Sequence, residues 1–319
     1  MQAHTKKIPE NFYRLTGNTT FSAWRQEGDT ELKLLLDLGF YGVYPQDLFC
    51  TIEANDASGD IIFDSPEEQL FAVKRREVEE FHTAVRAHSL TMDSAHFGQT
   101  LPPPNEEVEW ILPRHKALVE TAAIAGLKRF TTHMGWMYGL TSIQYMGDVA
   151  SRFNAGELSL VELHRLGREA YGGIGAMVED SVPIYQSLCD EAAKHGIMVT
   201  IETSCIEALE INARSDEIRR FIKKIDRDNL GVCLDPGHCF CQGVDPVSLT
   251  RELGSLIVET HFHDNFGDRD AHLPLGAGKI DWPGLLDAMI DIGYSGEITF
   301  EQSNHESNQR YWKHLISAQ

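Results

Sequence analysis

The sequence predicts an α/β protein of the (β/α)8 TIM-barrel class, folded as a single domain. Short apolar runs alternate with longer helical patterns eight times along 319 residues. This is the chain order of a parallel barrel whose strands are joined by helices. The alternative is an open, doubly wound sheet, which usually carries a glycine-rich phosphate-binding turn after an early strand. Neither the dinucleotide-binding nor the P-loop form of that turn occurs in the sequence.

The predicted strands are short segments rich in Val, Ile, Thr, Phe and Tyr, the residues that favour extended structure. They are expected at 11–16, 41–45, 91–96, 128–133, 197–203, 230–235, 257–263 and 297–301.

The predicted helices fill most of the intervals between these strands. One begins after Ser65-Pro66-Glu67-Glu68, where proline and acidic side chains favour the first turn of a helix. Several end at a glycine, the residue that most often terminates a helix, for example Gly126, Gly196 and Gly293. The remaining helices are expected at about 28–38, 105–126, 176–195, 214–225, 246–254 and 282–292.

One interval is too long for an ordinary connection. Residues 134–173 separate the fourth strand from its helix and include Trp136 and several Met, Tyr and Phe residues. Loops of this length in compact domains are often lids or binding elements. We expect an insertion over the site, although packing without a functional role is the alternative.

Composition restricts the partners and the compartment. The net charge is −20, from 48 acidic against 28 basic residues. Such a surface repels phosphate backbones, so we expect neither nucleic acid nor an anionic membrane as a partner. The N-terminus has no apolar signal segment, no apolar run is long enough to span a bilayer, and the six cysteines show no disulfide spacing. These features are typical of a cytoplasmic protein.

Metal-binding residue types recur where the predicted strands end. The third to the eighth strand end, in chain order, at His96, His133, Glu202, Asp235, His263 and Glu301. In a (β/α)8 barrel these ends form one rim, which carries the active site. Carboxylates and neutral imidazoles are the usual ligands of Zn, Mn, Co or Mg. A single such residue is more often structural, but six in succession predict a metal centre.

Five motifs carry a family resemblance. They are Ile201-Glu202; Leu234-Asp235-Pro236-Gly237-His238; His261-Phe262-His263; the loop from Asp270-Ala271-His272-Leu273-Pro274 to Ile280-Asp281-Trp282; and Gly293-Tyr294-Ser295-Gly296 with Phe300-Glu301. In these motifs, and from about Leu90 to Gln302, the chain resembles the xylose isomerase-like TIM barrels, the sugar phosphate isomerase/epimerase superfamily.

The resemblance implies roles for the matching residues. The metal ligands of the family match Glu202, Asp235, His263 and Glu301, which implies one divalent ion (Mn, Zn, Co or Mg). Its substrate-contacting residues match His238 and Arg269. At the rim, the residues expected to line the substrate cavity are His96, His133 and Trp136. Asp270 and His272 are either loop residues beside one metal or ligands of a second.

The implied reaction is isomerisation or epimerisation of a sugar, a sugar phosphate or a cyclitol. The metal would chelate a carbonyl oxygen and a neighbouring hydroxyl and stabilise the enediolate that forms when a proton leaves. Glu202 and Glu301 are expected to hold the metal and to act as base and acid on opposite faces of the carbon. The partner is therefore a small polyol, and the resemblance also implies a dimer or a tetramer.

Two departures from the epimerase pattern leave a second reaction open. Ala208 stands where the epimerases carry a substrate-contacting glutamate, and Gly276-Ala277-Gly278 replaces a Gly-Glu-Gly sequence. A dehydratase or lyase would begin with the same proton abstraction and then expel a leaving group from the neighbouring carbon. The sequence therefore permits lyase chemistry on a keto-sugar or cyclitol.

A third reading is a nuclease of the endonuclease-IV type, which binds three zinc ions and hydrolyses phosphodiesters. Its nine ligand types are matched in order by His96, His133, Glu202, Asp235, His238, His263, Asp270, His272 and Glu301. The net charge of −20 and the lack of a basic groove pattern disfavour it. A binding protein with a vestigial site is also disfavoured, because the inferred ligands are all present.

Overall fold

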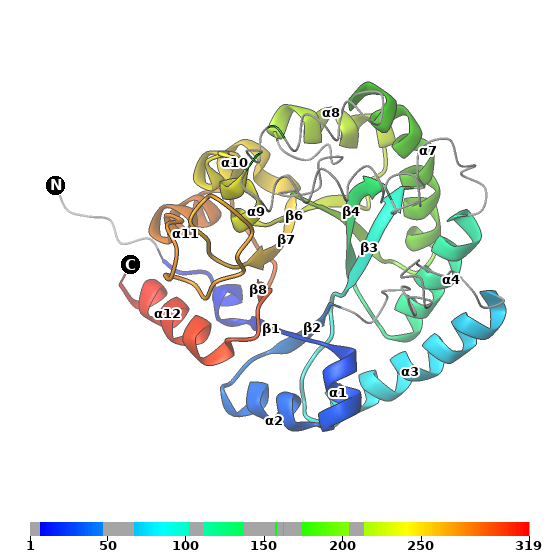
Figure 1. Cartoon of the computed structure of the whole chain (residues 1–319), viewed down its shortest axis with the longest axis horizontal. Helices are drawn as coiled ribbons and strands as arrows, with labels where there is room; N and C mark the ends of the chain where they lie inside the picture. The colour runs from blue at the N-terminus through cyan, green and yellow to red at the C-terminus, as the bar shows by residue number, and fades with distance from the viewer. Residues whose placement is uncertain are drawn as a thin grey trace.

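Parallel strands surround the centre of the molecule, and helices cover them on the outside (Figure 1). The computed structural model describes residues 7–46, 67–101, 111–136, 157, 162, 174–203 and 214–318. The eight strands pair in the order β2-β1-β8-β7-β6-β5-β4-β3, which confirms the predicted (β/α)8 barrel. They are β1 (Leu15–Thr19), β2 (Gly42–Pro45), β3 (His96–Leu101), β4 (Arg129–Trp136), β5 (Met198–Glu202), β6 (Leu230–Leu234), β7 (Ile257–Phe262) and β8 (Ile298–Phe300).

The segment before β3 closes the barrel against β2. Thr91 forms a parallel bridge with Gly42, and the carbonyl of Thr91 accepts a 2.9 Å hydrogen bond from the backbone N–H of Val43. On its other side this segment pairs irregularly with β4. The carbonyl of Ala95 accepts a hydrogen bond from the backbone N–H of Thr131 there. The two ends of the strand order therefore meet.

Two of the predicted strands were misplaced. The first half of the segment 11–16 belongs to a short 3-10 helix, η1 (Glu10–Tyr13), and β1 begins only at Leu15. The third strand was expected at 91–96, but β3 begins at His96. Residues 91–95, which precede β3, still form hydrogen bonds with both neighbouring strands. The sequence pattern therefore predicted a strand there, although the regular strand starts only at His96.

The helices largely follow the prediction, with additions near both ends. Observed but not predicted are α9 (Pro236–Cys241), η3 (Gly254–Leu256) and α12 (His305–Ser317), while the predicted helix at 28–38 is α2 (Thr30–Asp37) preceded by a separate α1 (Phe21–Glu27). The others are α3 (Glu67–Ala87), α4 (Ile111–Ile124), α7 (Ile174–Ala193), α8 (Ser215–Ile225), α10 (Pro246–Leu253) and α11 (Trp282–Asp291). The predicted insertion at 134–173 lies almost wholly outside the described residues and stays a prediction.

An aspartate caps each of the helices α10 and α11, and a proline lies in the first turn of each. Asp245 accepts hydrogen bonds from the N–H groups of Val247 and Ser248 at the start of α10, and Asp281 accepts from Gly284 at the start of α11. These side chains satisfy N–H groups that the first turn leaves unpaired. The proline that follows has the backbone torsion of a first turn already fixed.

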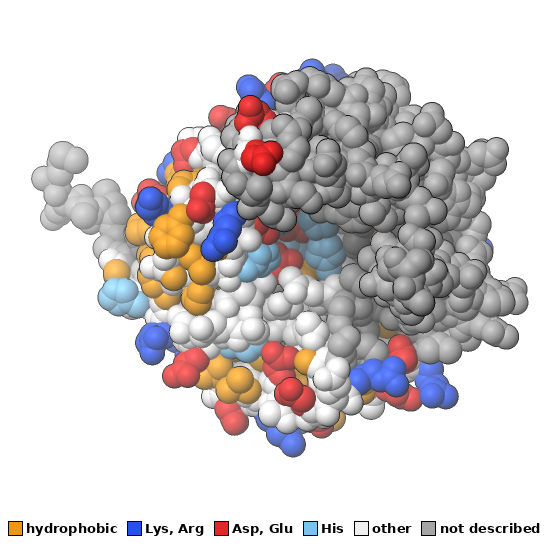
Figure 2. Space-filling model, viewed as in Figure 1, with side chains coloured by type: hydrophobic (Ala, Val, Ile, Leu, Met, Phe, Trp, Pro, Cys, Tyr) orange, Lys and Arg blue, Asp and Glu red, His pale blue; other side chains and the backbone are white. Residues whose placement is uncertain are grey.

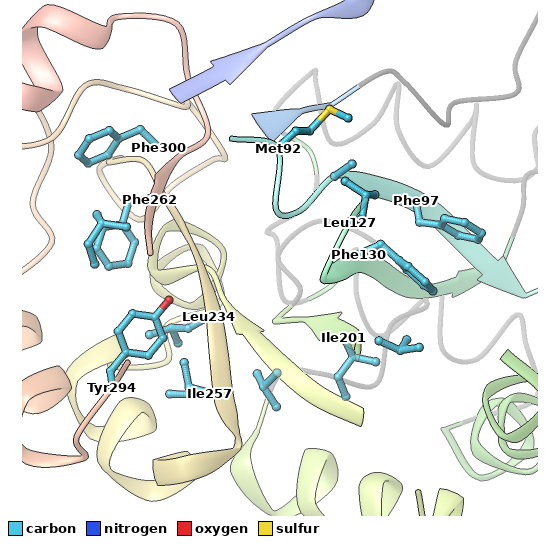
Figure 3. Packing of buried hydrophobic residues seen from close by; sticks show 14 of the residues in the cluster. Met92, Phe97, Leu127, Phe130, Ile201, Leu234, Ile257, Phe262, Tyr294 and Phe300 are labelled. Atoms are coloured by element: carbon cyan, nitrogen blue, oxygen red, sulfur yellow. The ribbon is translucent and has the colours of Figure 1, made fainter. Parts of the chain in front are cut away.

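The main apolar core lies between the strands and the outer helices (Figure 3). Phe262 of β7 packs against Trp282 of α11 and Trp312 of α12, with ring centroids 5.1 and 5.7 Å apart. On the other side of the barrel, Phe97 and Phe130 stack at 4.6 Å. No described helix is both long and apolar enough to cross a membrane.

Helix α12 packs against the outside of the barrel through Trp312. This side chain is 1% exposed, and its indole N–H donates a 2.9 Å hydrogen bond to the carbonyl of Phe12. Trp312→Ala should lower the free energy of unfolding by about 3–5 kcal/mol, because it leaves a cavity and an unpaired carbonyl. Urea unfolding followed by circular dichroism measures this effect. Leu34→Ala, at a 48% exposed position, should change stability by less than about 0.5 kcal/mol.

Candidate active site

Acidic and histidine side chains meet at the open end of the barrel, over the carboxyl ends of the strands. Figure 2 shows such side chains together at the centre of this face. Glu202 is the last residue of β5. Asp235, His263 and Glu301 are the first residues after β6, β7 and β8, respectively. All four are buried. The structure thus brings together the four predicted metal ligands.

The ligand atoms of these residues form two overlapping groups. Asp235 and Glu301 belong to both groups, one with His238 and His263 and the other with Glu202 and His261. Within each group the ligand atoms lie within 4.8 Å of one another. His263 Nε2 is 3.0 Å from Asp235 Oδ2.

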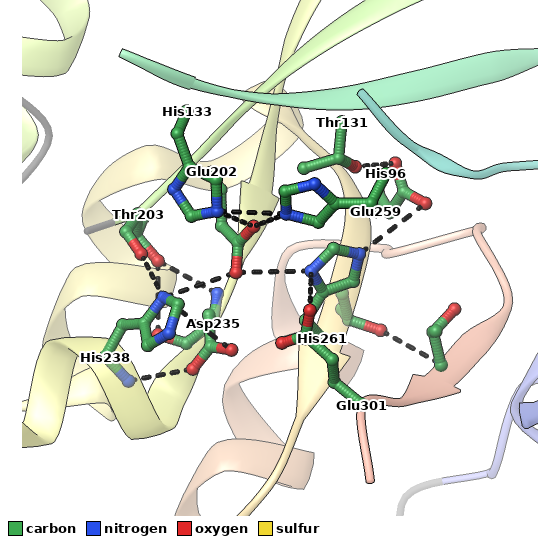
Figure 4. A network of polar contacts seen from close by, with 12 residues as sticks. His96, Thr131, His133, Glu202, Thr203, Asp235, His238, Glu259, His261 and Glu301 are labelled. Atoms are coloured by element: carbon green, nitrogen blue, oxygen red, sulfur yellow. Dashed lines mark hydrogen bonds and ion pairs between the residues drawn. The ribbon is translucent and has the colours of Figure 1, made fainter. Parts of the chain in front are cut away.

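Strand alternation explains why β7 contributes so many polar groups. Glu259, His261 and His263 occupy alternate positions, which place their side chains on one face of the strand. The intervening Phe262 instead packs outward against the helices. The inward face of β7 is therefore polar from Glu259 onward, as Figure 4 shows for Glu259 and His261.

The turn after β6 positions Asp235 and His263 together. Asp235 caps α9, and its Oδ1 accepts a 2.8 Å hydrogen bond from the N–H of His238, which leaves Oδ2 directed at His263. A Cβ atom added at Gly237 would overlap the His263 ring. Glycine is therefore required here because the backbone of α9 approaches the imidazole closely.

A second group lies on the β3–β4 side of Glu202. The Nε2 atoms of His96 and His133 are 2.9 Å apart, and they lie 3.5 and 3.4 Å from Glu202 Oε2. Their predicted positions at strand ends were wrong, since His96 begins β3 and His133 lies within β4. The two strands are staggered, so both rings still reach Glu202.

A third group contains the loop residues Asp270 and His272. His272 Nε2 lies 2.9 Å from Asp270 Oδ2, and His238 Nε2 lies 3.5 Å from the same oxygen. The His272 ring stacks on His263 with centroids 4.0 Å apart. His272 has a φ of 43°, a left-handed conformation that is uncommon for residues other than glycine and often marks functional sites.

Asp264 fixes the loop that carries this third group. Its carboxylate accepts hydrogen bonds from the backbone N–H groups of Asn265, Gly276 and Ile280 and from the indole N–H of Trp282, at 2.9 to 3.3 Å. Four N–H donors compensate a buried carboxylate without a cation. The sequence pattern did not indicate this role for Asp264.

Neighbouring histidines hold the carboxylates of Glu202 and Asp270 in their ionised form. Burial alone raises the pKa of Glu202, but His261 and His133 bring it well below its usual value. Burial likewise raises the pKa of Asp270, and hydrogen bonds with His238 and His272 lower it to a greater extent. Ionised carboxylates are the form that binds a metal.

The residues present fit a divalent cation. Among the described residues, buried polar atoms that make no hydrogen bond include both ring nitrogens of His263, Asp235 Oδ2, Asp270 Oδ1 and Glu301 Oε2. Buried polar atoms without partners are rare in native proteins. Carboxylate oxygens and imidazole nitrogens are also the donors that such ions accept.

Other predicted residues lie apart or cannot be placed. Arg269 is exposed on the loop after β7, and it makes no ion pair with any described residue. Trp136 ends β4, but its side chain lies outside the described part of the structure, as does Ala208.

His261 was missed as a site residue. The alternation of β7 was the signal that could have found it, since His261 shares its face with His263.

Gly237→Ala tests the close approach of α9 to His263. The added methyl group should displace the imidazole and weaken divalent metal binding by about tenfold. Isothermal titration calorimetry with Mn²⁺ measures the affinity. Gln242→Ala, just beyond the end of the same helix, serves as the control and should bind like the unmodified protein. Equal affinity in both variants would contradict the assigned role of Gly237.

Several curated proteins resemble part of this chain. Inosose isomerase of Bacillus subtilis is 27% identical over 130 residues, which are 39% of this chain and 46% of the relative. D-psicose 3-epimerase of Ruminiclostridium cellulolyticum is 26% identical over 125 residues (36% and 41%). Probable endonuclease 4 of Campylobacter fetus subsp. fetus is 27% identical over 112 residues (30% and 40%). The chain thus spans less than half the length of these curated relatives.

Solved structures share the fold over nearly the whole chain. A D-tagatose 3-epimerase-like protein matches with a TM-score of 0.62 and 16% identity, over 95% of this chain and 96% of that one. The probable 3-DHS dehydratase AsbF from Bacillus anthracis matches with a TM-score of 0.58 and 13% identity, over 94% and 98%. At these identities the likeness establishes the fold alone.

The family assignment comes from a wider match. The sequence model of the xylose isomerase-like TIM barrel matches residues 49–318. This range includes the strands β3 to β8 and every candidate ligand described above. The chain therefore belongs to the xylose isomerase-like TIM-barrel family.

Proposed function

We propose that the protein is a divalent-metal-dependent isomerase or epimerase of a sugar or a related polyol such as a cyclitol. The observation that carries the proposal is the convergence of two buried glutamates from distant strands, Glu202 of β5 and Glu301 after β8, on one imidazole. Their Oε1 atoms lie 3.2 and 3.5 Å from His261 Nδ1. The names of the related inosose isomerase and psicose epimerase support the same class.

The metal would be held by Glu202, Asp235, His263 and Glu301. When bound, it would supply Lewis acidity to two neighbouring oxygens of the substrate. Asp235 Oδ2 and His263 Nε2 already face each other at 3.0 Å. The identity of the ion stays open among Mn, Zn, Co and Mg, because a site of oxygen and nitrogen donors accepts each of them.

The two glutamates also supply the proton chemistry. Glu202 would remove the proton from the carbon beside the carbonyl, and Glu301 would return a proton to the opposite face. His238, whose Nδ1 lies 3.2 Å from Glu202 Oε1, would donate a hydrogen bond to a substrate hydroxyl. His96, His133, Arg269 and Trp136 remain candidates for further substrate contacts.

A dehydratase would use the same residues. Proton abstraction by one glutamate would then be followed by loss of a hydroxyl from the neighbouring carbon, with the other glutamate giving it a proton. Ala208, at the position where the epimerases carry a glutamate, leaves room for this reaction, and the pairing of two buried glutamates fits both. We place isomerisation first because two of the matched relatives bear isomerase or epimerase names.

A second candidate function follows from the number of ligand groups. Besides the central groups, the described residues form one group of His96, His133 and Glu202 and another of His238, His263, Asp270 and His272. Several overlapping ligand groups, rather than one, favour a multi-zinc phosphodiesterase, and probable endonuclease 4 is among the matched relatives. The net charge of −20 opposes the binding of a phosphate backbone.

Solvent deuterium exchange tests the proposed proton abstraction. A panel of ketoses and inososes in D₂O should include one substrate that gains deuterium in its NMR spectrum. Glu202→Gln and Glu301→Gln should each reduce this exchange by at least about 1,000-fold while the circular dichroism spectrum is kept, because amides neither accept nor return the proton. Glu306→Gln, at an exposed position on α12, should retain full exchange. Full activity in either site variant would refute the assignment.

Metal content separates the two candidate functions. Inductively coupled plasma mass spectrometry of the purified chain should give about one divalent ion per chain for sugar chemistry. A value of about three zinc ions per chain, together with cleavage of a duplex containing an abasic site, would instead support the nuclease.

A further inference from the structure

A column of charged side chains fills the barrel below the candidate metal ligands. Arg129 of β4 donates a hydrogen bond to Glu297, and its Nε lies 3.6 Å from Glu259 Oε1. Glu259 Oε2 accepts hydrogen bonds from Thr131 at 2.8 Å and from Thr200 at 3.0 Å. Glu259 is 1% exposed. Barrel interiors are usually filled by branched apolar residues, so a buried charged column is unusual.

His261 connects this column to the site above it. Its Nε2 lies 4.0 Å from Glu259 Oε1, and its Nδ1 lies 3.2 Å from Glu202 Oε1 and 3.5 Å from Glu301 Oε1 (Figure 4). The ring is fully buried, and Tyr44 packs against it at a centroid distance of 4.5 Å. One imidazole therefore touches both glutamates from one side and faces a third carboxylate on the other.

We propose that His261 is a positioning residue, which holds Glu202 and Glu301 at a fixed spacing and is itself oriented from below by Glu259, Arg129 and Glu297. The inference rests on the proposed function. Two carboxylates on separate strands repel each other, and a shared contact through one nitrogen opposes their separation. Nδ1 of His261 lies beside Oε1 of each glutamate, and Oε2 of Glu301 makes no hydrogen bond and is available to a ligand.

The geometry favours this role over a separate metal site in the column. Cys233, Glu259 and His261 have ligand atoms within 4.8 Å of one another. However, two threonine hydroxyls already use Glu259 Oε2, and the Arg129 guanidinium lies beside Oε1. A cation placed there would lie next to another cation. The column is therefore a support for His261.

Cobalt binding tests the proposal without requiring turnover. Co²⁺ alone is titrated into the full chain, and the affinity and the visible absorption spectrum of the bound ion are recorded. His261→Leu keeps the volume but removes both nitrogens, so it should weaken binding by about 10- to 100-fold and change the spectrum. His261→Asn keeps a donor near the position of Nδ1 and should restore the affinity to within about threefold.

Glu259→Gln tests whether the column below His261 affects metal binding at the site above it. Glu259 shares no group of candidate ligands with Glu202, Asp235 or Glu301 among the described residues. The amide can still accept from the threonine hydroxyls, so the fold should survive, yet cobalt affinity should fall by about tenfold. This variant carries the test if His261→Leu does not fold. His115→Leu, at a buried histidine of α4 that packs beside Phe97, controls for the loss of a histidine elsewhere.

The outcomes separate the proposal from the proposed function. Cobalt binding that is unchanged or tighter in Glu259→Gln, or in a folded His261→Leu, would overturn the positioning role. A wild-type chain that binds no cobalt would overturn both the proposed function and this role. A wild-type chain that binds cobalt but exchanges deuterium into no sugar would overturn the proposed reaction alone, and the positioning role would stand on the cobalt data.

Discussion

Negative charge buried at the open end of the barrel is the constraint to which the surrounding structure responds. Glu202, Asp235 and Glu301 are each at most 5% exposed, and an isolated carboxylate in such surroundings is strongly destabilising. The protein compensates with imidazoles from β4 and β7 and, at Asp235, with one helix N–H group. A divalent cation would complete this compensation, and its binding would then be coupled to the integrity of the site.

The same constraint explains the polar barrel interior. Charges stacked along the axis, from Glu297 through Arg129 and Glu259 to His261, alternate in sign, so each has a neighbour that stabilises it. The apolar core is displaced outward, between strands and helices, where Phe262, Trp282 and Trp312 pack (Figure 3). On the same strands, the outward side chains form the apolar core, and the inward side chains form the candidate site and the charged column.

Much of the fold and of the site follows from local sequence patterns, and the exceptions have physical causes. The proximity of Glu202, Asp235, His263 and Glu301 was predictable because each residue closes an apolar strand at the same end of a barrel. The start of β3 was not, since residues 91–95 bond irregularly to both neighbours. The contacts of His261 and Asp264 were not predictable either, because most of their partners lie between 12 and 59 residues away. Helix α12 lacks a strong local signal and is defined by packing.

Crystals grown with Mn²⁺ and measured at the manganese absorption edge would test the central claim most directly. We expect one anomalous peak per chain, bound by Glu202, Asp235, His263 and Glu301, with His261 behind the two glutamates and not bound to the ion. A peak held by other residues would contradict the proposed metal centre. So would the absence of any peak between these four side chains.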